Sequence, residues 1–433
     1  MRATQHFGCD MRRPMPTRPI DVLLYGAGGF TGRLTVAEFS RHAPAGLRWA
    51  LAGRHRGKLE AARDAADGPG RPAEILEADS ARPETVEAAV SRARVVLSTA
   101  GPFAAYGNAV VDACVQHRAH YVDITGETPW VADVIARHHV QAAADGTRII
   151  PFSGFDSVPS DLGSLLVVEH LRSRGTGCAE VVAAFRVRAA LNGGTAATAL
   201  QLFESGQARR AGHPFLLDGP GRPRLTPEEF LRTRDPKGVR WNPELRRWLA
   251  PFVMSMVNTR VVRRSAMLAA EAGTPYGSHF AYGEFMTARS RTQATVVAVG
   301  LAGAQLALAS PLRPLLKRML PAPGTGPSEE VRRNGWFRLD LVATGEDGRR
   351  AFGLVKDQGD PGNTVTVKCV CEAALALAVD GARLPGGPTH GGVLTPATGL
   401  GQVLVERLRA RGMTLETADA PFEAASTGRT SSP

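Results

Sequence analysis

The chain has 433 residues, and its 52 lysines and arginines outnumber its 41 aspartates and glutamates to give a net charge of +11. This length predicts two domains with a core large enough to hold without disulfides. Its five cysteines match no zinc-ligand spacing and are typical of a reducing compartment, which excludes a disulfide-stapled secreted fold.

The positive charge lies almost wholly in arginine, since the chain contains only five lysines. Abundant alanine and glycine accompany this bias, which indicates a high-GC genome as one source of it. We therefore predict no nucleic-acid partner. An arginine-rich surface leaves contact with an anionic lipid or an acidic protein open.

Residues 1–18 are rich in Arg and Pro and lack the apolar core of a secretory signal. We interpret them as a disordered leader. The protein is expected in the cytoplasm, with membrane association left open.

Residues 21–33 organise the first domain, because the unbroken apolar run at 22–25 leads directly into closely spaced glycines. Such a run is typical of a parallel strand buried on both faces. Glycines at every third position allow a tight turn, close approach of the backbone to a diphosphate, and an anion site at the start of the next helix. A strand, turn and helix without nucleotide is the alternative. The cofactor contacts predicted here are Gly26, Gly28, Gly29, Phe30, Thr31 and Gly32.

The second strand, predicted at residues 47–54, ends where the adenosine ribose of a dinucleotide lies. No Asp or Glu occurs from residue 47 to residue 58 to bind the 2′-hydroxyl of NAD, whereas Arg54, Arg56 and Lys58 supply cations. A guanidinium can donate two parallel hydrogen bonds to a 2′-phosphate. We therefore predict NADP as the cofactor, with Arg54 and Lys58 as contacts, against the alternative of a solvated helix start.

The next strands are predicted at residues 74–79 and 95–101, with a helix at 83–92 between them. The end of the fourth strand should pass beneath the cofactor, because ligands of open α/β sheets bind at the carboxyl edge. Asp79 is equally consistent with a helix cap. The further cofactor contacts predicted here are Asp79, Thr99, Ala100, Gly101 and Pro102.

Helices predicted at residues 107–117 and 128–144 alternate with strands at 119–127 and 147–152. This alternation predicts an α/β fold that begins with a Rossmann-type doubly wound parallel sheet over residues 19–160.

Five segments of this half occur in a characteristic order, namely GAGGFTGR, AGRHRGKL, STAGPF, YVDITGE and SGFDSVPSDLG. With GGTAAT, PAPGTGPSEE, DPGN and GGVLTPATGLG after them, the chain resembles the saccharopine dehydrogenase-like oxidoreductases, and within them the trans-acting enoyl reductases. The resemblance implies an NADP-binding Rossmann domain, an inserted second domain, and reduction of a carbon–carbon double bond on a long acyl substrate. Asn363 departs from the tyrosine that usually follows Asp-Pro-Gly in the family, so no role of that ring is carried over.

An α+β substrate domain is predicted over residues 161–363. A strand at 181–188 and a helix at 196–208 enter it, and the polar, Arg- and Pro-rich residues 214–249 are expected to form a surface excursion.

The most unusual part of this domain is the apolar segment 294–312, which is rich in small residues, carries Gln305 near its middle and has basic residues on both sides. Three interpretations are open. It is a buried helix or the wall of an acyl tunnel, an interfacial segment that docks on lipid, or a transmembrane helix, for which its hydrophobicity is marginal.

The C-terminal part is predicted to contain a hairpin, then helices within residues 364–415 that pack on the Rossmann domain, then a flexible tail at 416–433. The hairpin strands and the helices are expected at residues 336–344, 350–356, 365–379 and 399–411.

Enoyl reduction requires a hydride for the β carbon, a donor that polarises the thioester carbonyl and an acid for the α carbon. The catalytic candidates are Tyr106, Asp123 and Asp156, all expected at the carboxyl edge of the sheet. A packing role is the alternative for Tyr106, and turn, hinge or cap roles are the alternatives for the two aspartates. No spacing predicts a metal.

Three functions remain open. The first is an NADPH-dependent enoyl reductase whose acyl or lipid substrate is presented by a carrier protein or synthase, with peripheral membrane contact and a homodimer as further expectations. A saccharopine-type amino-acid dehydrogenase would need a polar pocket that the sequence does not reveal. The third is a non-catalytic NADP-binding protein at a lipid surface.

Overall fold

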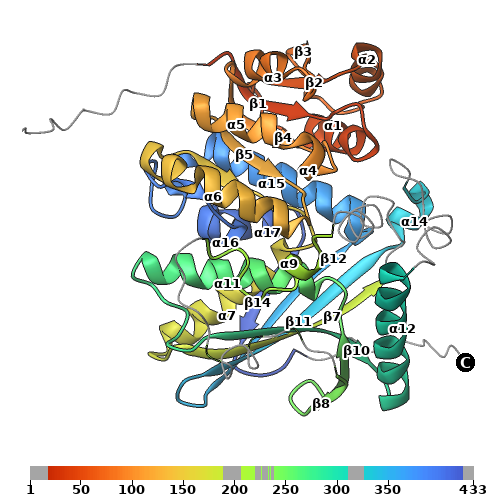
Figure 1. Ribbon diagram of the computed structural model, residues 1–433, viewed down its shortest axis with the longest axis vertical. Coiled ribbons are helices and arrows are strands. Elements are labelled where there is room, and N and C mark those ends of the chain that lie inside the picture. The colour runs from red at the N-terminus through yellow and green to blue at the C-terminus, as the bar shows by residue number, and fades with distance from the viewer. Residues whose placement is uncertain are drawn as a thin grey trace, which may run out of the picture.

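The computed structural model describes residues 18–188, 206–219, 226, 233, 235, 238–310 and 326–422. The predictions for the leader at 1–17, for most of the helix at 196–208 and for the GGTAAT motif lie outside these residues. Two seven-stranded sheets form the framework of the described chain, with helices packed around and between them (Figure 1).

The first sheet is parallel throughout and has the strand order β13-β6-β5-β4-β1-β2-β3. All six residues of β1 are buried, as expected for a central parallel strand. The order reverses between β1 and β4, the position at which doubly wound sheets bind ligands. The strands are β1 (Ile20–Tyr25), β2 (Trp49–Gly53), β3 (Glu74–Glu77), β4 (Ala93–Ser98), β5 (His120–Asp123), β6 (Arg148–Ile150) and β13 (Gly392–Val393).

Helices cover both faces of this sheet, which confirms the predicted doubly wound fold. They are α1 (Phe30–His42), α2 (Arg56–Asp64), α3 (Pro83–Val90), α4 (Phe103–Tyr106), α5 (Asn108–His117), α6 (Thr128–Asp145) and α15 (Thr366–Val379). The helices α1, α2 and α15 pack with Val22 and Leu24 of β1, whereas α3, α5 and α6 pack with Ile20 and Leu23. The return of α15 to the first sheet was also predicted.

The second sheet has the order β14-β12-β11-β7-β10-β9-β8 and is antiparallel except where β7 pairs with β10. Its apolar face packs on α7 and α11, so that the core of the first domain continues into the second. These elements are α7 (Val158–Ser173), α11 (Ser255–Glu271), β7 (Cys178–Arg188), β8 (Arg240–Asn242), β9 (Arg247–Pro251), β10 (Ala281–Ala288), β11 (Trp336–Gly345), β12 (Arg350–Gln358) and β14 (Thr414–Ala418). The pairing of β11 with β12 confirms the predicted hairpin.

Several short elements complete the described chain. They are α9 (Ala208–Ala211), α14 (Glu329–Arg333), η1 (Pro361–Val365), η2 (Gly381–Arg383), α16 (Pro396–Gly399) and α17 (Gly401–Ala410).

Both ends of the described chain are more ordered than the sequence indicates. Arg18, assigned to the leader, is 6% exposed, and its guanidinium donates to the carbonyl oxygens of Ala93 and His117. Residues 416–418, assigned to the flexible tail, belong to β14, which pairs with the edge of β12 and buries Leu415. Both predictions were wrong at these positions, because the stabilising partners are distant in the sequence.

The apolar segment forms the helix α12 (Arg291–Ala309), and most of its side chains are exposed. Its interpretation as a buried helix is therefore wrong for the described residues. Within the described chain, the helix that is long and apolar enough to cross a membrane is Pro361–Val379, and it lies mostly inside the protein as a core helix.

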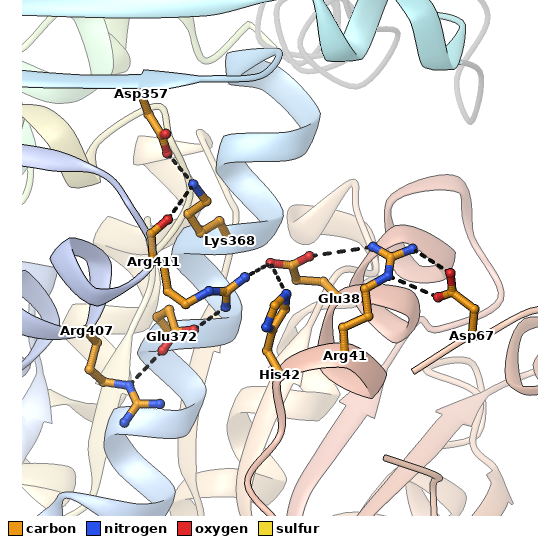
Figure 2. A network of polar contacts seen from close by, with 9 residues as sticks. All are labelled: Glu38, Arg41, His42, Asp67, Asp357, Lys368, Glu372, Arg407 and Arg411. Carbon is orange, nitrogen blue, oxygen red and sulfur yellow. Dashed lines mark hydrogen bonds and ion pairs between the residues drawn. The ribbon is translucent and has the colours of Figure 1, made fainter. Parts of the chain in front are cut away.

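A polar network holds the C-terminal helices on the first domain (Figure 2). Arg411 lies 2.6 Å from Glu38 of α1 and 2.5 Å from Glu372 of α15. Arg407 of α17 adds a second contact to Glu372 at 2.8 Å. Helices from opposite ends of the chain are thereby fixed together through the C-terminal half of α1.

Candidate cofactor and active site

The segment that leads from the end of β1 into α1 contains two glycines, Gly26 and Gly32, at which a side chain would clash with the backbone. Gly26 has a φ of 84°, and a Cβ there would lie 2.9 Å from the backbone nitrogen of Ala100. A Cβ on Gly32 would lie 2.2 Å from the carbonyl oxygen of Gly26. The backbone of the turn therefore lies directly against the ends of β4 and α1, and this close packing suits a diphosphate cradle.

The start of α1 is open to an anion. Its N-cap, Gly29, provides no side-chain cap, and its first turn, which begins with Phe30 and Thr31, contains no acidic residue. The N–H groups and the dipole of such a helix start favour a phosphate. Residues of the second domain reach this point, because Arg332 lies 5.8 Å from the ring centre of Phe30.

The cations predicted at the end of β2 differ in their partners. Arg56 pairs with Glu60 at 3.0 Å, so its charge is neutralised within α2. Arg54 and Lys58 are exposed, and neither has a carboxylate partner among the described residues. Lys58 also lies close to the glycine turn. A Cβ placed on Gly28 would be 3.1 Å from the Cβ of Lys58. These two cations lie at the end of β2, where the sequence predicts the 2′-phosphate contact.

The ends of β4 and β3 carry the other predicted cofactor contacts. The backbone N–H of Thr99 donates to the carbonyl oxygen of Tyr25 at 2.9 Å, which places the segment Ala100, Gly101 and Pro102 beside the cradle. Asp79 accepts a hydrogen bond from the backbone N–H of Ala81 at 3.1 Å and so shapes the turn after β3.

Tyr106 lies with the cofactor residues. The guanidinium carbon of Arg54 is 5.6 Å from the centre of its ring, which is 37% exposed. The helix α4 that carries it is fixed by Glu127, whose carboxylate accepts from the backbone N–H groups of Phe103 and Ala104 at 2.7 and 2.9 Å. The structure thus brings Tyr106 to the predicted 2′-phosphate contact.

Asp123 is fully buried at the end of β5, and its carboxylate is saturated. It accepts from the hydroxyl of Tyr121 at 2.9 Å and from the backbone N–H groups of Thr125 and Phe152 at 3.0 and 3.2 Å. Burial raises its pKa to about 7. These contacts tie the ends of β5 and β6 together.

Asp156 has a different environment, although it follows the neighbouring strand. It is partly exposed in the turn between β6 and α7, and its carboxylate makes no hydrogen bond to any described residue. Burial raises its pKa to about 6. An unpaired carboxyl group with a pKa near neutrality is suited to proton transfer.

The sequence missed a buried polar cluster behind this turn. Glu284 of β10 accepts hydrogen bonds from Ser160, Asn258 and Tyr282, each at 2.7 Å, and burial raises its pKa to about 7. Ser157, next to Asp156, bonds to Asn258 at 3.1 Å. The cluster fixes the start of α7 to the second domain. The one signal in the sequence was a glutamate at an apolar-face position of a strand.

Comparisons with known proteins agree with this geometry. Residues 22–150 match the family described as saccharopine dehydrogenase NADP binding domain. A Mycobacterium tuberculosis protein provisionally named as a trans-acting enoyl reductase is 39% identical over 422 residues, covering 92% of this chain and 98% of that protein. The trans-acting enoyl reductase of Mycobacterium bovis is 35% identical over 426 residues, with 92% and 98% covered.

One solved structure extends the likeness to the whole fold. The apo histidine-tagged saccharopine dehydrogenase (L-Glu forming) from Saccharomyces cerevisiae matches 92% of this chain and 99% of its own length, with a TM-score of 0.50. At 12% sequence identity this match shows the fold alone. The first domain thus has both the fold and the cradle of an NAD(P)-type site.

Proposed function

The chain belongs to the family of trans-acting enoyl reductases, and from this premise we propose that it reduces the carbon–carbon double bond of a long-chain acyl substrate with NADPH. The observation that carries the proposal is the glycine cradle of an NAD(P)-type site in a chain that aligns with these relatives over 92% of its length.

The preference for NADPH over NADH rests on Arg54 and Lys58. Both cations are exposed at the adenosine end of the cradle without a carboxylate partner among the described residues, whereas Arg56 is paired with Glu60. A 2′-phosphate would provide the missing anion, and Arg54 can bind it through two parallel hydrogen bonds.

We assign the proton transfer to Asp156. A dinucleotide whose diphosphate lies at α1 and whose adenosine lies over β2 directs its other half toward β4, β5 and β6. Asp156 follows β6 and carries an unpaired carboxyl group, whereas Asp123 is saturated by three hydrogen bonds. The cofactor supplies the hydride for the β carbon, and Asp156 in its protonated form delivers the proton to the α carbon.

Tyr106 is better explained as a cofactor contact than as an acid. Its ring faces the guanidinium of Arg54, a position that suits stacking beside the adenosine. Asp123 is proposed to position the ends of β5 and β6, and Asp79 to shape the turn after β3.

The word trans-acting in the names of the relatives supports a partner synthase that presents the acyl chain on a carrier. We place the protein in the cytoplasm, in peripheral contact with a membrane, and retain the homodimer as a prediction. The similarity to the yeast saccharopine dehydrogenase does not support the amino-acid dehydrogenase alternative, because it is a similarity of fold alone.

Analysis of lipids in a strain that lacks the gene tests the proposal. We expect unsaturated acyl chains to accumulate and to disappear when the gene is restored. Restoration by a variant with Asp156→Asn should leave them in place, whereas an unchanged lipid profile in the deletion strain would contradict the proposed reaction.

A further inference from the structure

The helix α12 presents an apolar stripe to solvent. Ser290 caps its start by accepting the backbone N–H of Gln293 at 3.1 Å, and Ala294 is buried in a small cluster with Ala250 and Ala288. In Figure 1 the helix stands at one end of the second sheet, where it packs on β9 and β10. Its Gln305 also donates to the sulfur of Met256 in α11 at 3.9 Å. A large part of its circumference therefore has no partner among the described residues.

The exposed side chains of this stripe follow helical spacing. Val296, Val299 and Leu306 lie at positions i, i+3 and i+10, and their exposed fractions are 66%, 66% and 72%. Gly303 occupies position i+7 between them. Aligned apolar side chains of this kind indicate a contact surface, because isolated exposed apolar residues do not form a continuous stripe.

Tryptophan and arginine side chains gather at the N-terminal end of α12. The guanidinium carbon of Arg291 lies 5.9 Å from the ring centre of Trp248. Trp241, 47% exposed, packs against Trp248 with 5.6 Å between ring centres. Arg289 adds another exposed cation, and no acidic residue occurs from residue 289 to residue 310. Tryptophan beside cations at the end of an apolar helix is the arrangement expected at a membrane interface.

We infer that α12 is a docking surface for an anionic lipid bilayer, with its apolar stripe inserted among the acyl chains and its arginines at the headgroups. The absence of acidic residues and the flanking cations favour an anionic lipid over an uncharged one.

The surface is linked to the cofactor site along the chain. After α12 the described chain resumes at Gly326, where a Cβ would lie 2.2 Å from the ring of Phe30 in the first turn of α1. This inference rests on the proposed function, because an enzyme that acts on a long acyl substrate benefits from lying at the membrane.

Flotation of the full chain with lipid vesicles tests the inference without depending on catalysis. We expect binding to vesicles that contain phosphatidylglycerol, weaker binding to pure phosphatidylcholine, and loss of binding at high salt. A paired substitution, Val296→Ser with Val299→Ser, should weaken binding about tenfold or more, because each valine loses its apolar insertion. Valine and serine have similar helix propensities, so α12 should persist.

The matched control removes two exposed valines elsewhere, Val140→Ser with Val379→Ser, and should bind vesicles as the unaltered protein does. Both double variants should reduce a soluble enoyl thioester at the unaltered rate. Equal binding by the α12 variant and the control, or no binding by the unaltered protein, would overturn the inference. So would a dimer, detected by sedimentation, that the α12 substitutions dissociate. Failure of the reductase activity alone would contradict the proposed function and leave vesicle binding unaffected.

Discussion

Arg411 lies 2.6 Å from Glu38, which joins the residue that follows α17 to the helix that opens at the cofactor turn (Figure 2). The same guanidinium lies 2.5 Å from Glu372, whose side chain is almost fully buried. Arg411→Ala should lower the free energy of unfolding by about 2 kcal/mol, because it removes one cation from this partly buried network. Urea denaturation measures the loss.

The exposed pair of Arg210 with Asp133, which lies outside this network, is the control for that substitution. Arg210→Ala should cost less than about 1 kcal/mol, as exposed ion pairs do. Equal losses for the two variants would show that Arg411 has no special role in joining the helices.

Arg54→Ala should raise the dissociation constant for NADPH about tenfold, the loss expected when charged hydrogen bonds to a phosphate are removed. Affinity for NADH, which lacks the 2′-phosphate, should stay within about twofold. Arg56→Ala provides a matched control, because Arg56 is already paired with Glu60. Titration of both nucleotides by fluorescence would refute the assignment if Arg54→Ala weakened both equally.

Asp156→Asn should lower kcat about 100-fold while NADPH binding is retained, because the amide cannot supply the proton. In the unaltered enzyme kcat should fall about tenfold per pH unit above about 6, where the carboxyl group loses its proton. Asp123→Asn is the matched comparison and should keep kcat within a few-fold, since an amide oxygen still accepts from Thr125 and Phe152. A large fall in kcat for Asp123→Asn, with little change for Asp156→Asn, would instead make Asp123 the proton donor.

Tyr106→Phe should leave kcat unchanged, because the proposed contact with Arg54 requires the ring and not its hydroxyl. Tyr106→Ala should raise the KM for NADPH a few-fold with little change in kcat. Steady-state kinetics at saturating substrate separates the two constants. A large fall in kcat for the phenylalanine variant would return Tyr106 to the role of acid.

The stability of the fold should fall with rising pH because of Glu284, whose pKa burial raises to about 7. A carboxyl group with a raised folded-state pKa contributes stability that is present below its unfolded pKa and lost as the pH rises through 7. The free energy of unfolding should therefore decrease less between pH 5 and pH 8 in Glu284→Gln than in the unaltered protein, by up to about 3 kcal/mol. Asp123 and Asp161, whose pKa values burial also raises to about 7, should keep part of the slope.

Exposed Glu329 is the control for the pH experiment, and Glu329→Gln should leave the slope unchanged. An unaltered slope in Glu284→Gln would mean that the buried glutamate is ionised throughout this range.

Sequence alone predicted what depends on local pattern. The apolar run of β1, the glycine turn and the alternation of strands with helices are readable because neighbouring residues determine them. The edge strand β14 was missed because its five residues are stabilised by β12, and β13 was missed because it has only two.

In the candidate site, too, local sequence patterns were predictable and features that depend on distant partners were not. The glycines and Arg54 were predicted as cofactor contacts from their positions relative to a predicted strand. Asp123 and Asp156 looked alike in the sequence, since both were expected at the carboxyl edge of the sheet. Only the fold distinguishes the hydrogen-bonded carboxylate of Asp123 from the unpaired one of Asp156. The exposure of α12 was also hidden, because an apolar helical sequence is compatible with a core, a lipid surface or a membrane.

Transfer of deuterium from the nicotinamide C4 position of labelled NADPH to an α,β-unsaturated acyl thioester tests the central claim most directly. Mass spectrometry should find a saturated product with deuterium at the β carbon, and the same reaction in heavy water should label the α carbon. Bound NADPH with no transfer to any enoyl thioester, or transfer only to the carbon of a C–N bond, would contradict it.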